Sequence, residues 1–184
     1  CKEIIEPTID ELIKRKIEYK GVLYFGLMIT KSGPKVIEYN CRFGDPECQT
    51  IMPLMDINFV NVLYKCAIGN LNGDEKVLST SKVSGCVIAS SKGYPENYDV
   101  GFPISINYDE HEEIQIFHSG TSINNEGKII TDGGRVLSVV CQGKDFDSAF
   151  ITAYRVLKGI NFDGIYYRKD IGHQVRKNYS FEDL

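Results

Sequence analysis

Apolar residues recur at helical spacing near the start of the chain. They lie three or four positions apart, as on one face of a helix: Ile9, Leu12, Ile13 and Ile17. Thr8 followed by Glu11 matches a capping box, in which each side chain satisfies a free backbone amide of the first turn. Gly21 is the first glycine after this pattern, and glycine commonly ends helices. The pattern therefore predicts a helix that Thr8 caps and Gly21 ends.

Two strand-like stretches follow this helix. The first is apolar and runs from Val22 to Thr30, and the second runs from Val36 to Arg42. The break between them contains Gly33 and Pro34, which are typical of turns. An antiparallel hairpin is therefore expected.

An apolar segment from Cys48 to Leu71 is expected to be helical in two pieces. Pro53 would break it, because proline lacks the backbone N–H that continues a helix, and Asp56 would cap the second piece. A buried stripe is predicted on that piece: Phe59, Val60, Leu63 and Ala67.

Beyond a polar stretch at 72–81 the pattern becomes rich in short strands separated by turn residues. The expected strands are Val83–Ser90, Ile104–Ile106, Ile114–Thr121, Lys128–Thr131 and Val136–Gln142. A helix capped by Asp145 or Asp147 follows, and Gly159 closes it. Its expected buried face is Phe146, Ala149, Phe150, Ala153, Tyr154 and Leu157. The prediction is an α+β protein with two domains, 1–75 and 76–184, the second a small β-rich domain with a helix.

Composition excludes several classes of protein. The net charge of −4 gives no electrostatic reason to expect nucleic acid as a partner. No apolar run approaches the roughly 20 residues that cross a bilayer, so no membrane partner is expected. The six cysteines are widely spaced and suit a reduced, cytoplasmic protein better than a disulfide framework. Since the chain begins at Cys1 without a methionine, we expect it to be part of a longer protein.

The second strand carries the most informative side chains. If it is extended, Glu38, Asn40 and Arg42 share one face, spaced roughly 7 Å apart. A carboxylate and an amide oxygen suit Mg²⁺, which keeps several waters and binds substrate phosphates. Arginine can hold a phosphate or carboxylate through two hydrogen bonds. The same alternation is also typical of the solvent-exposed face of an edge hairpin. Spacing alone therefore leaves both a metal site and an ordinary exposed face open.

The strand runs directly into the turn Arg42-Phe43-Gly44-Asp45-Pro46-Glu47. A turn at a strand end is a usual place for functional residues. The whole stretch VIEYNCRFGDPE resembles the signature of the phosphoribosylamine–glycine ligase family, whose members are ATP-grasp enzymes of purine biosynthesis. Three later stretches agree with this resemblance in the same order: FHSGT at 117–121, DGGRVL at 132–137 and YRKDIG at 167–172.

The resemblance implies a fold, a reaction and partners. The chain would be the carboxy-terminal part of an ATP-grasp lobe followed by a small α+β domain, and the amino-terminal lobes of the enzyme would be missing. The implied enzyme ligates glycine to 5-phosphoribosylamine at the expense of ATP, through a glycyl phosphate. Magnesium or manganese would be required. The isolated chain is expected to be inactive.

The resemblance also implies roles for single residues. Glu38 and Asn40 match the metal ligands, and Arg42 would stabilise the acyl phosphate, with a structural salt bridge as its alternative. Asp45 would hold the glycine amine or orient Arg42. Adenine would contact Leu27 and Met28, for which plain core packing is an equal alternative.

Gly134 and Arg135 would bind the substrate phosphate, with a tight hairpin as their alternative.

Two other functions compete with the ligase. One is another ATP-grasp carboxylate–amine ligase or carboxylase, against which the stretches FHSGT and DGGRVL argue. The other is a non-catalytic module derived from the same fold. Retention of Glu38, Asn40 and Arg42 together argues against that module.

Overall fold

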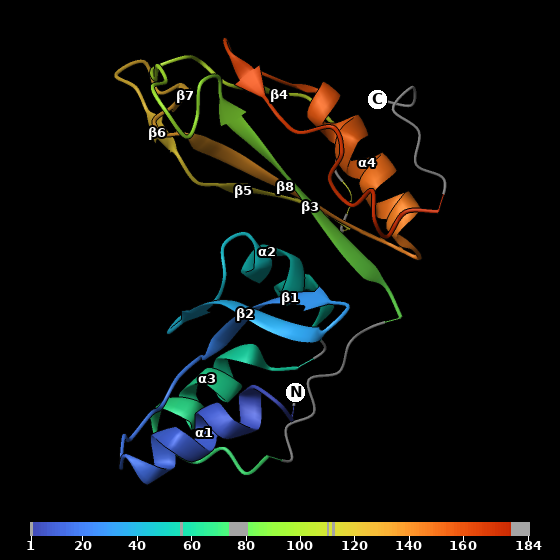
Figure 1. Cartoon of the computed structure of the whole chain (residues 1–184). Coiled ribbons are helices and arrows are strands. Elements are labelled where there is room, and N and C mark those ends of the chain that lie inside the picture. The colour runs from blue at the N-terminus through green and yellow to red at the C-terminus, as the bar shows by residue number, and fades with distance from the viewer. Residues whose placement is uncertain (1, 56, 74–80, 110, 112, 178–184) are drawn as a thin grey trace. The chain divides into compact units, whose positions relative to one another are not determined.

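The computed structural model describes residues 2–55, 57–73, 81–109, 111 and 113–177 (Figure 1). Its contacts divide the chain into two compact units. The amino-terminal unit comprises Cys1–Cys48 and Asp56–Leu78, and the carboxy-terminal unit comprises Gln49–Met55 and Ser79–Leu184. The predicted boundary between residues 75 and 76 lies outside the described residues and stays a prediction.

Helix α1 spans Ile5–Lys14, earlier in the chain than predicted. The capping box was wrong, because Thr8 lies inside the helix and its hydroxyl donates to the Ile4 carbonyl at 2.7 Å. The helix ends at Lys14, seven residues before Gly21. Lys16 adopts a left-handed conformation with φ 55°, and the Ile17 amide donates to the Leu12 carbonyl at 3.0 Å. This is a Schellman ending, which a lysine completes here in place of the expected glycine.

The predicted hairpin is confirmed as β1 (Tyr24–Thr30) and β2 (Gly33–Asn40), which pair antiparallel. Gly26 pairs with Glu38 and Leu27 with Val36, so Ile37 is an extra residue on β2. Such a bulge interrupts strict alternation of side chains. As a result Val36 and Tyr39 line the same groove against α1.

The next segment is helical in pieces, as predicted. It contains α2 (Glu47–Ile51), a 3₁₀ turn η1 (Met52–Leu54) that includes Pro53, and α3 (Phe59–Ala67). Asn58 caps α3, since its side chain accepts from the Asn61 amide at 3.0 Å. The predicted cap Asp56 lies outside the described residues. The predicted buried stripe was wrong, because α3 has no buried residue and Val60 is 75% exposed.

The carboxy-terminal unit is built on a four-stranded antiparallel sheet in the order β10-β3-β8-β5 (Figure 1). The two central strands are β3 (Val83–Ser91) and β8 (Arg135–Gly143), with β5 (Ile114–His118) and β10 (Ile165–Tyr166) at the edges. Together with the helices, this arrangement confirms the predicted α+β class.

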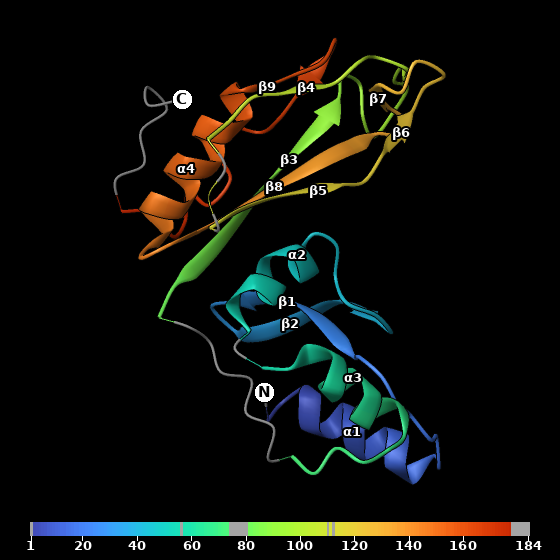
Figure 2. The ribbon, with the colours of Figure 1, turned by 180° about the vertical axis from the view of Figure 1, so that it is seen from behind.

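Short strand pairs complete the unit. Strand β4 (Ser105–Ile106) pairs with β9 (Ile160–Asn161), as Figure 2 shows from behind. Strand β6 (Thr121–Ile123) pairs with β7 (Ile129–Thr131). The predicted strand Ile114–Thr121 is therefore split between β5 and β6 at Ser119-Gly120. The two-residue strands β9 and β10 were not predicted.

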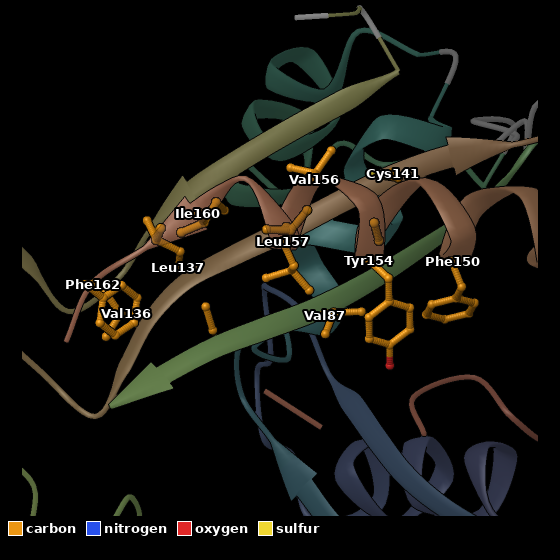
Figure 3. Packing of buried hydrophobic residues seen from close by; sticks show 13 residues of the cluster. Val87, Val136, Leu137, Cys141, Phe150, Tyr154, Val156, Leu157, Ile160 and Phe162 are labelled. Atoms are coloured by element: carbon orange, nitrogen blue, oxygen red, sulfur yellow. The ribbon is translucent and has the colours of Figure 1, made fainter. Parts of the chain in front are cut away.

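Helix α4 (Phe146–Lys158) packs against β3 and β8 and forms the hydrophobic core with them (Figure 3). Asp145 caps it, accepting from the Ser148 amide at 2.8 Å, so Asp145 is the cap of the two candidates. Phe150, Tyr154 and Leu157 extend from α4 toward the strands, and Val87 and Leu137 belong to the same buried cluster. The predicted apolar face of this helix is confirmed, and Gly159 closes it.

Tyr154 also anchors the segment after β10. Its hydroxyl donates to the Arg168 carbonyl at 2.9 Å and accepts from the Ile171 amide at 3.1 Å. One buried phenol thus satisfies two backbone groups of the segment that follows β10.

The described cysteines Cys41, Cys48, Cys66, Cys86 and Cys141 form no disulfide. Burial raises the pKa of Cys141 to about 12, so this thiol is inert at neutral pH. Among the residues that the structure describes, none of the helices combines the length and apolar character needed to span a membrane.

Substitution of Leu157 tests the core. Leu157 is 1% exposed, so Leu157→Ala is expected to lower the free energy of unfolding by about 2–5 kcal/mol through lost burial and a residual cavity. Ile151 lies on the same helix but is 56% exposed. Ile151→Ala is therefore expected to change the free energy of unfolding by about 0.5 kcal/mol or less. Urea denaturation of both variants measures the difference. Equal losses would contradict the assignment of the core.

Candidate functional site

The hairpin places Glu38 and Asn40 next to each other at the end of β2. The Asn40 side-chain amide Nδ2 donates to Glu38 Oε1 at 3.0 Å. Across the hairpin, Glu38 faces Gly26 and Asn40 faces Tyr24. Because Gly26 has no side chain, the stem of Glu38 lies over the backbone of β1. The two predicted metal ligands are therefore brought together, with their carboxylate and amide groups in contact.

Tyr24 connects this pair to the turn that follows. Its hydroxyl donates to Glu47 Oε1 at 3.2 Å, and Glu47 begins helix α2. Burial raises the pKa of Tyr24, and the neighbouring carboxylates of Glu47 and Glu38 raise it further because they disfavour a phenolate. Two carboxylates thus flank one phenol at this end of the hairpin.

The turn itself carries Arg42 and Asp45. Arg42 is exposed, and its Nη1 donates to the Phe43 carbonyl at 2.8 Å. No carboxylate within the described part of the chain forms an ion pair with Arg42, which weighs against a purely structural salt bridge. Asp45 is exposed and lies close enough to Cys48 to raise the pKa of that thiol, after the larger effect of burial.

Leu27 and Met28 lie on β1, beyond the bulge. Leu27 is half-buried and pairs with Val36, while Met28 pairs with Lys35 and is 54% exposed. A methionine exposed to this degree is not packed in the core of the described unit. Its side chain is available to an apolar ligand or to another part of a larger protein.

Gly134 and Arg135 belong to the carboxy-terminal unit, at the start of β8. The ring of Tyr94 covers Gly134, leaving no room for a side chain there. The Gly134 carbonyl accepts from the Ser91 amide at 2.8 Å, and Arg135 is half-buried. Close packing against Tyr94 therefore explains why position 134 is a glycine, which agrees with the hairpin alternative. A contact between Gly134 and substrate stays a prediction.

The donor set of Glu38 and Asn40 fits a divalent ion that is bound only partly by protein. Among the described residues, no group of three or more histidine, cysteine, aspartate or glutamate side chains is arranged to hold a metal. One carboxylate with one amide oxygen leaves most of an octahedral shell to water and phosphate oxygens, which is the usual situation of Mg²⁺ at nucleotide sites.

Sequence reasoning missed Tyr24 and Gly26 as members of this site. Both lie on the preceding strand, ten or more residues before the motif begins at Val36, and look like ordinary strand positions. The signal that would have found them is the hairpin register, which sets Tyr24 opposite Asn40 and Gly26 opposite Glu38.

Comparison with known proteins places both units in one family. A family model described as the ATP-grasp (A) domain of phosphoribosylglycinamide synthetase matches residues 1–48, and a model of the C domain of the same enzyme matches residues 84–174. A phosphoribosylamine–glycine ligase from Synechocystis is 46% identical over 176 residues, which are 95% of this chain and 42% of that protein.

Solved structures agree with these matches. The crystal structure of a phosphoribosylamine–glycine ligase from Thermotoga maritima superposes with a TM-score of 0.81 at 33% identity, covering 93% of this chain and 42% of that one. The biotin carboxylase domain of a 2-oxoglutarate carboxylase from Hydrogenobacter thermophilus superposes with a TM-score of 0.60 at 14% identity, over 89% of this chain and 39% of that one, and shares the fold alone. The chain thus spans about two fifths of the length of these relatives.

The position of Tyr24 predicts its titration. Tyr24 is expected to ionise above the ordinary value of 10, and Glu47→Gln is expected to lower its pKa by removing one neighbouring charge. Because its folded pKa is raised, Tyr24 favours the folded state fully below about pH 10 and less as pH rises through its folded pKa. NMR titration of ¹³C-labelled tyrosine measures both values, with Tyr24→Phe to assign the signal.

A matched control for this titration is Glu18→Gln, which removes a carboxylate elsewhere in the amino-terminal unit, where Glu18 pairs with Lys20. It is expected to leave the pKa of Tyr24 unchanged. Ionisation of Tyr24 below pH 10, or equal effects of the two substitutions, would contradict the geometry described above.

Proposed function

Because the chain belongs to the phosphoribosylglycinamide synthetase family, we propose that it forms part of an ATP-dependent ligase that joins glycine to 5-phosphoribosylamine in purine biosynthesis. The observation that carries this proposal is the contact between Glu38 and Asn40 on the strand next to an arginine-bearing turn, within the region that matches the ATP-grasp domain. The chain spans 42% of such ligases, so the activity is proposed for the whole enzyme.

Glu38 and Asn40 would hold a divalent ion, Mg²⁺ or Mn²⁺, through the free oxygens of the carboxylate and the amide. When bound, that ion neutralises phosphate charge. The hydrogen bond from Asn40 Nδ2 to Glu38 Oε1 orients the amide so that its oxygen is left for the ion. This fixed pair supports ATP binding at the end of β2.

Arg42 is proposed to stabilise the acyl phosphate. In the ligation, the glycine carboxylate attacks the γ-phosphate of ATP and ADP leaves, which gives glycyl phosphate. The amine of phosphoribosylamine then attacks the acyl carbon, loses a proton and displaces phosphate. Two anions meet in the first step, so a guanidinium beside them lowers the barrier by neutralising charge. The exposed Arg42 has no ion-pair partner among the described residues, which suits this role.

Asp45 is proposed to hold the glycine amine or to orient Arg42, since Asp45 and Arg42 lie in the same turn. Leu27 and Met28 are proposed to contact adenine, with Met28 more exposed than a core residue of this unit would be. Arg135, beside Gly134, is proposed to bind the phosphate of phosphoribosylamine. A guanidinium recognises phosphate through two parallel hydrogen bonds.

The remaining part of the ligase is proposed as the partner of the amino-terminal unit. A groove of about 610 Å³ lies between α1 and β2, and the residues that line it include the apolar Ile4, Leu12 and Val36. Elsewhere in the unit, Ile13 is 68% exposed. Apolar surface of this kind is normally covered in a stable protein. The portion of the relatives that lies outside this match is long enough to cover it.

Removal of Glu38 tests the function in the full-length parent ligase. Glycine-dependent phosphate release from ATP, with phosphoribosylamine present, is expected to fall roughly 100-fold or more in Glu38→Ala, because electrostatic groups at reacting centres contribute on this scale. The control Glu18→Ala removes a surface carboxylate and is expected to keep full activity. Release that does not depend on glycine would favour a different acceptor. Full activity of Glu38→Ala would contradict the metal-binding role and favour the alternative, in which Glu38 is an ordinary residue on the solvent-exposed face of a hairpin.

The 184-residue chain by itself is expected to release no phosphate above background under the same conditions. The reason is that the matched region spans only 42% of the relatives and its amino-terminal unit leaves apolar surface uncovered. Glycine-dependent turnover by this chain alone would contradict the proposal that further parts of the ligase complete the site.

A further inference from the structure

We propose that Gly26 is a positioning residue for the metal-binding pair, because its missing side chain is the space in which the Glu38 carboxylate reaches Asn40. This inference rests on the proposed function, in which Glu38 and Asn40 hold a divalent ion. It concerns a residue on the opposite strand that has no side chain with which to bind the ion or a substrate.

The hairpin register brings the two residues face to face. Gly26 is the direct antiparallel partner of Glu38. A Cβ placed at Gly26 with ideal geometry would lie 2.7 Å from Glu38 Cγ and 3.5 Å from Glu38 Oε1. A carbon–carbon contact of 2.7 Å is not tolerated, so any side chain at this position displaces the stem of Glu38.

A side chain at position 26 would affect the carboxylate oxygen that connects Glu38 to Asn40. Glu38 Oε1, the carboxylate atom nearest to the ideal Cβ of Gly26, accepts the hydrogen bond from Asn40 Nδ2. Displacement of Glu38 therefore breaks its contact with Asn40 as well. Glu38 is exposed, so its side chain can rotate into solvent while the hairpin stays folded. The expected consequence of a larger residue is a displaced carboxylate in a folded chain.

The backbone does not explain the glycine. Gly26 is not among the residues with positive φ, so its conformation is accessible to any amino acid. Glycine within a strand normally weakens it, and its presence often marks a close approach by another group. Here the group that approaches is the side chain of Glu38. Alanine at this position is expected to be neutral or favourable for the hairpin itself.

The first experiment uses the 184-residue chain and needs no activity. In Gly26→Ala, the side-chain amide resonances of Asn40 in a ¹⁵N NMR spectrum are expected to shift toward those of Glu38→Ala, because both lose the same hydrogen bond. Thermal unfolding is expected to be unchanged. Lys31→Ala, in the turn of the same hairpin, serves as the control and is expected to leave Asn40 unaffected. An unshifted Asn40 amide in Gly26→Ala would overturn the proposal.

The second experiment uses the full-length parent ligase and separates metal binding from chemistry. Gly26→Ala is expected to raise the KM for Mg²⁺ about tenfold or more, the scale on which groups supporting a ligand affect metal affinity. At saturating Mg²⁺, kcat is expected to change much less, and Lys31→Ala is expected to behave like wild type. An unchanged KM for Mg²⁺ in Gly26→Ala, together with a large effect of Glu38→Ala, would overturn the positioning role and leave the proposed function intact.

Failure of the proposed function looks different. If Glu38→Ala itself leaves the Mg²⁺ dependence unchanged, the assignment of Glu38 as a metal ligand is wrong. The effect of Gly26 on metal binding is then wrong as well.

Discussion

Burial of apolar surface between α4 and the central strands β3 and β8 is the interaction on which the described fold depends. The buried hydrophobic side chains among the described residues all lie between positions 87 and 162. Leu137 of β8 and Leu157 of α4 both belong to this buried cluster. The hydrophobic effect is the main favourable contribution to folding, and in the described structure it is concentrated in the carboxy-terminal unit.

The amino-terminal unit contrasts with this arrangement. Its helices α1 and α3 are amphipathic but have no buried residue, and the strands of its hairpin expose apolar side chains such as Ile29 and Ile37. A two-stranded hairpin is marginally stable alone and needs further strands or helices against one face. The residues proposed for chemistry thus lie on a unit that leaves apolar side chains exposed, in contrast to the buried core of the carboxy-terminal unit.

Within that unit, the pairing register of the hairpin decides which groups can act together. It sets Glu38 over Gly26 and Asn40 beside Tyr24, and the bulge at Ile37 fixes this offset. Tyr24 then extends the arrangement to Glu47 at the start of α2. A shift of one residue would turn Glu38 and Asn40 to the other face, since side chains alternate along a strand.

The sequence by itself determined the features that depend on local chemistry. Periodicity and turn residues determined the hairpin, the helix that Asp145 caps and the α+β class. The stretch VIEYNCRFGDPE, together with FHSGT, DGGRVL and YRKDIG, determined the family resemblance, and that resemblance pointed to Glu38 and Asn40 as candidate metal ligands. Only the tertiary structure decided the ends of α1, where Lys16 replaces the expected glycine, and the exposure of Val60. It alone also decided the roles of Tyr24 and Gly26, because those depend on contacts across strands, which no pattern within one segment contains.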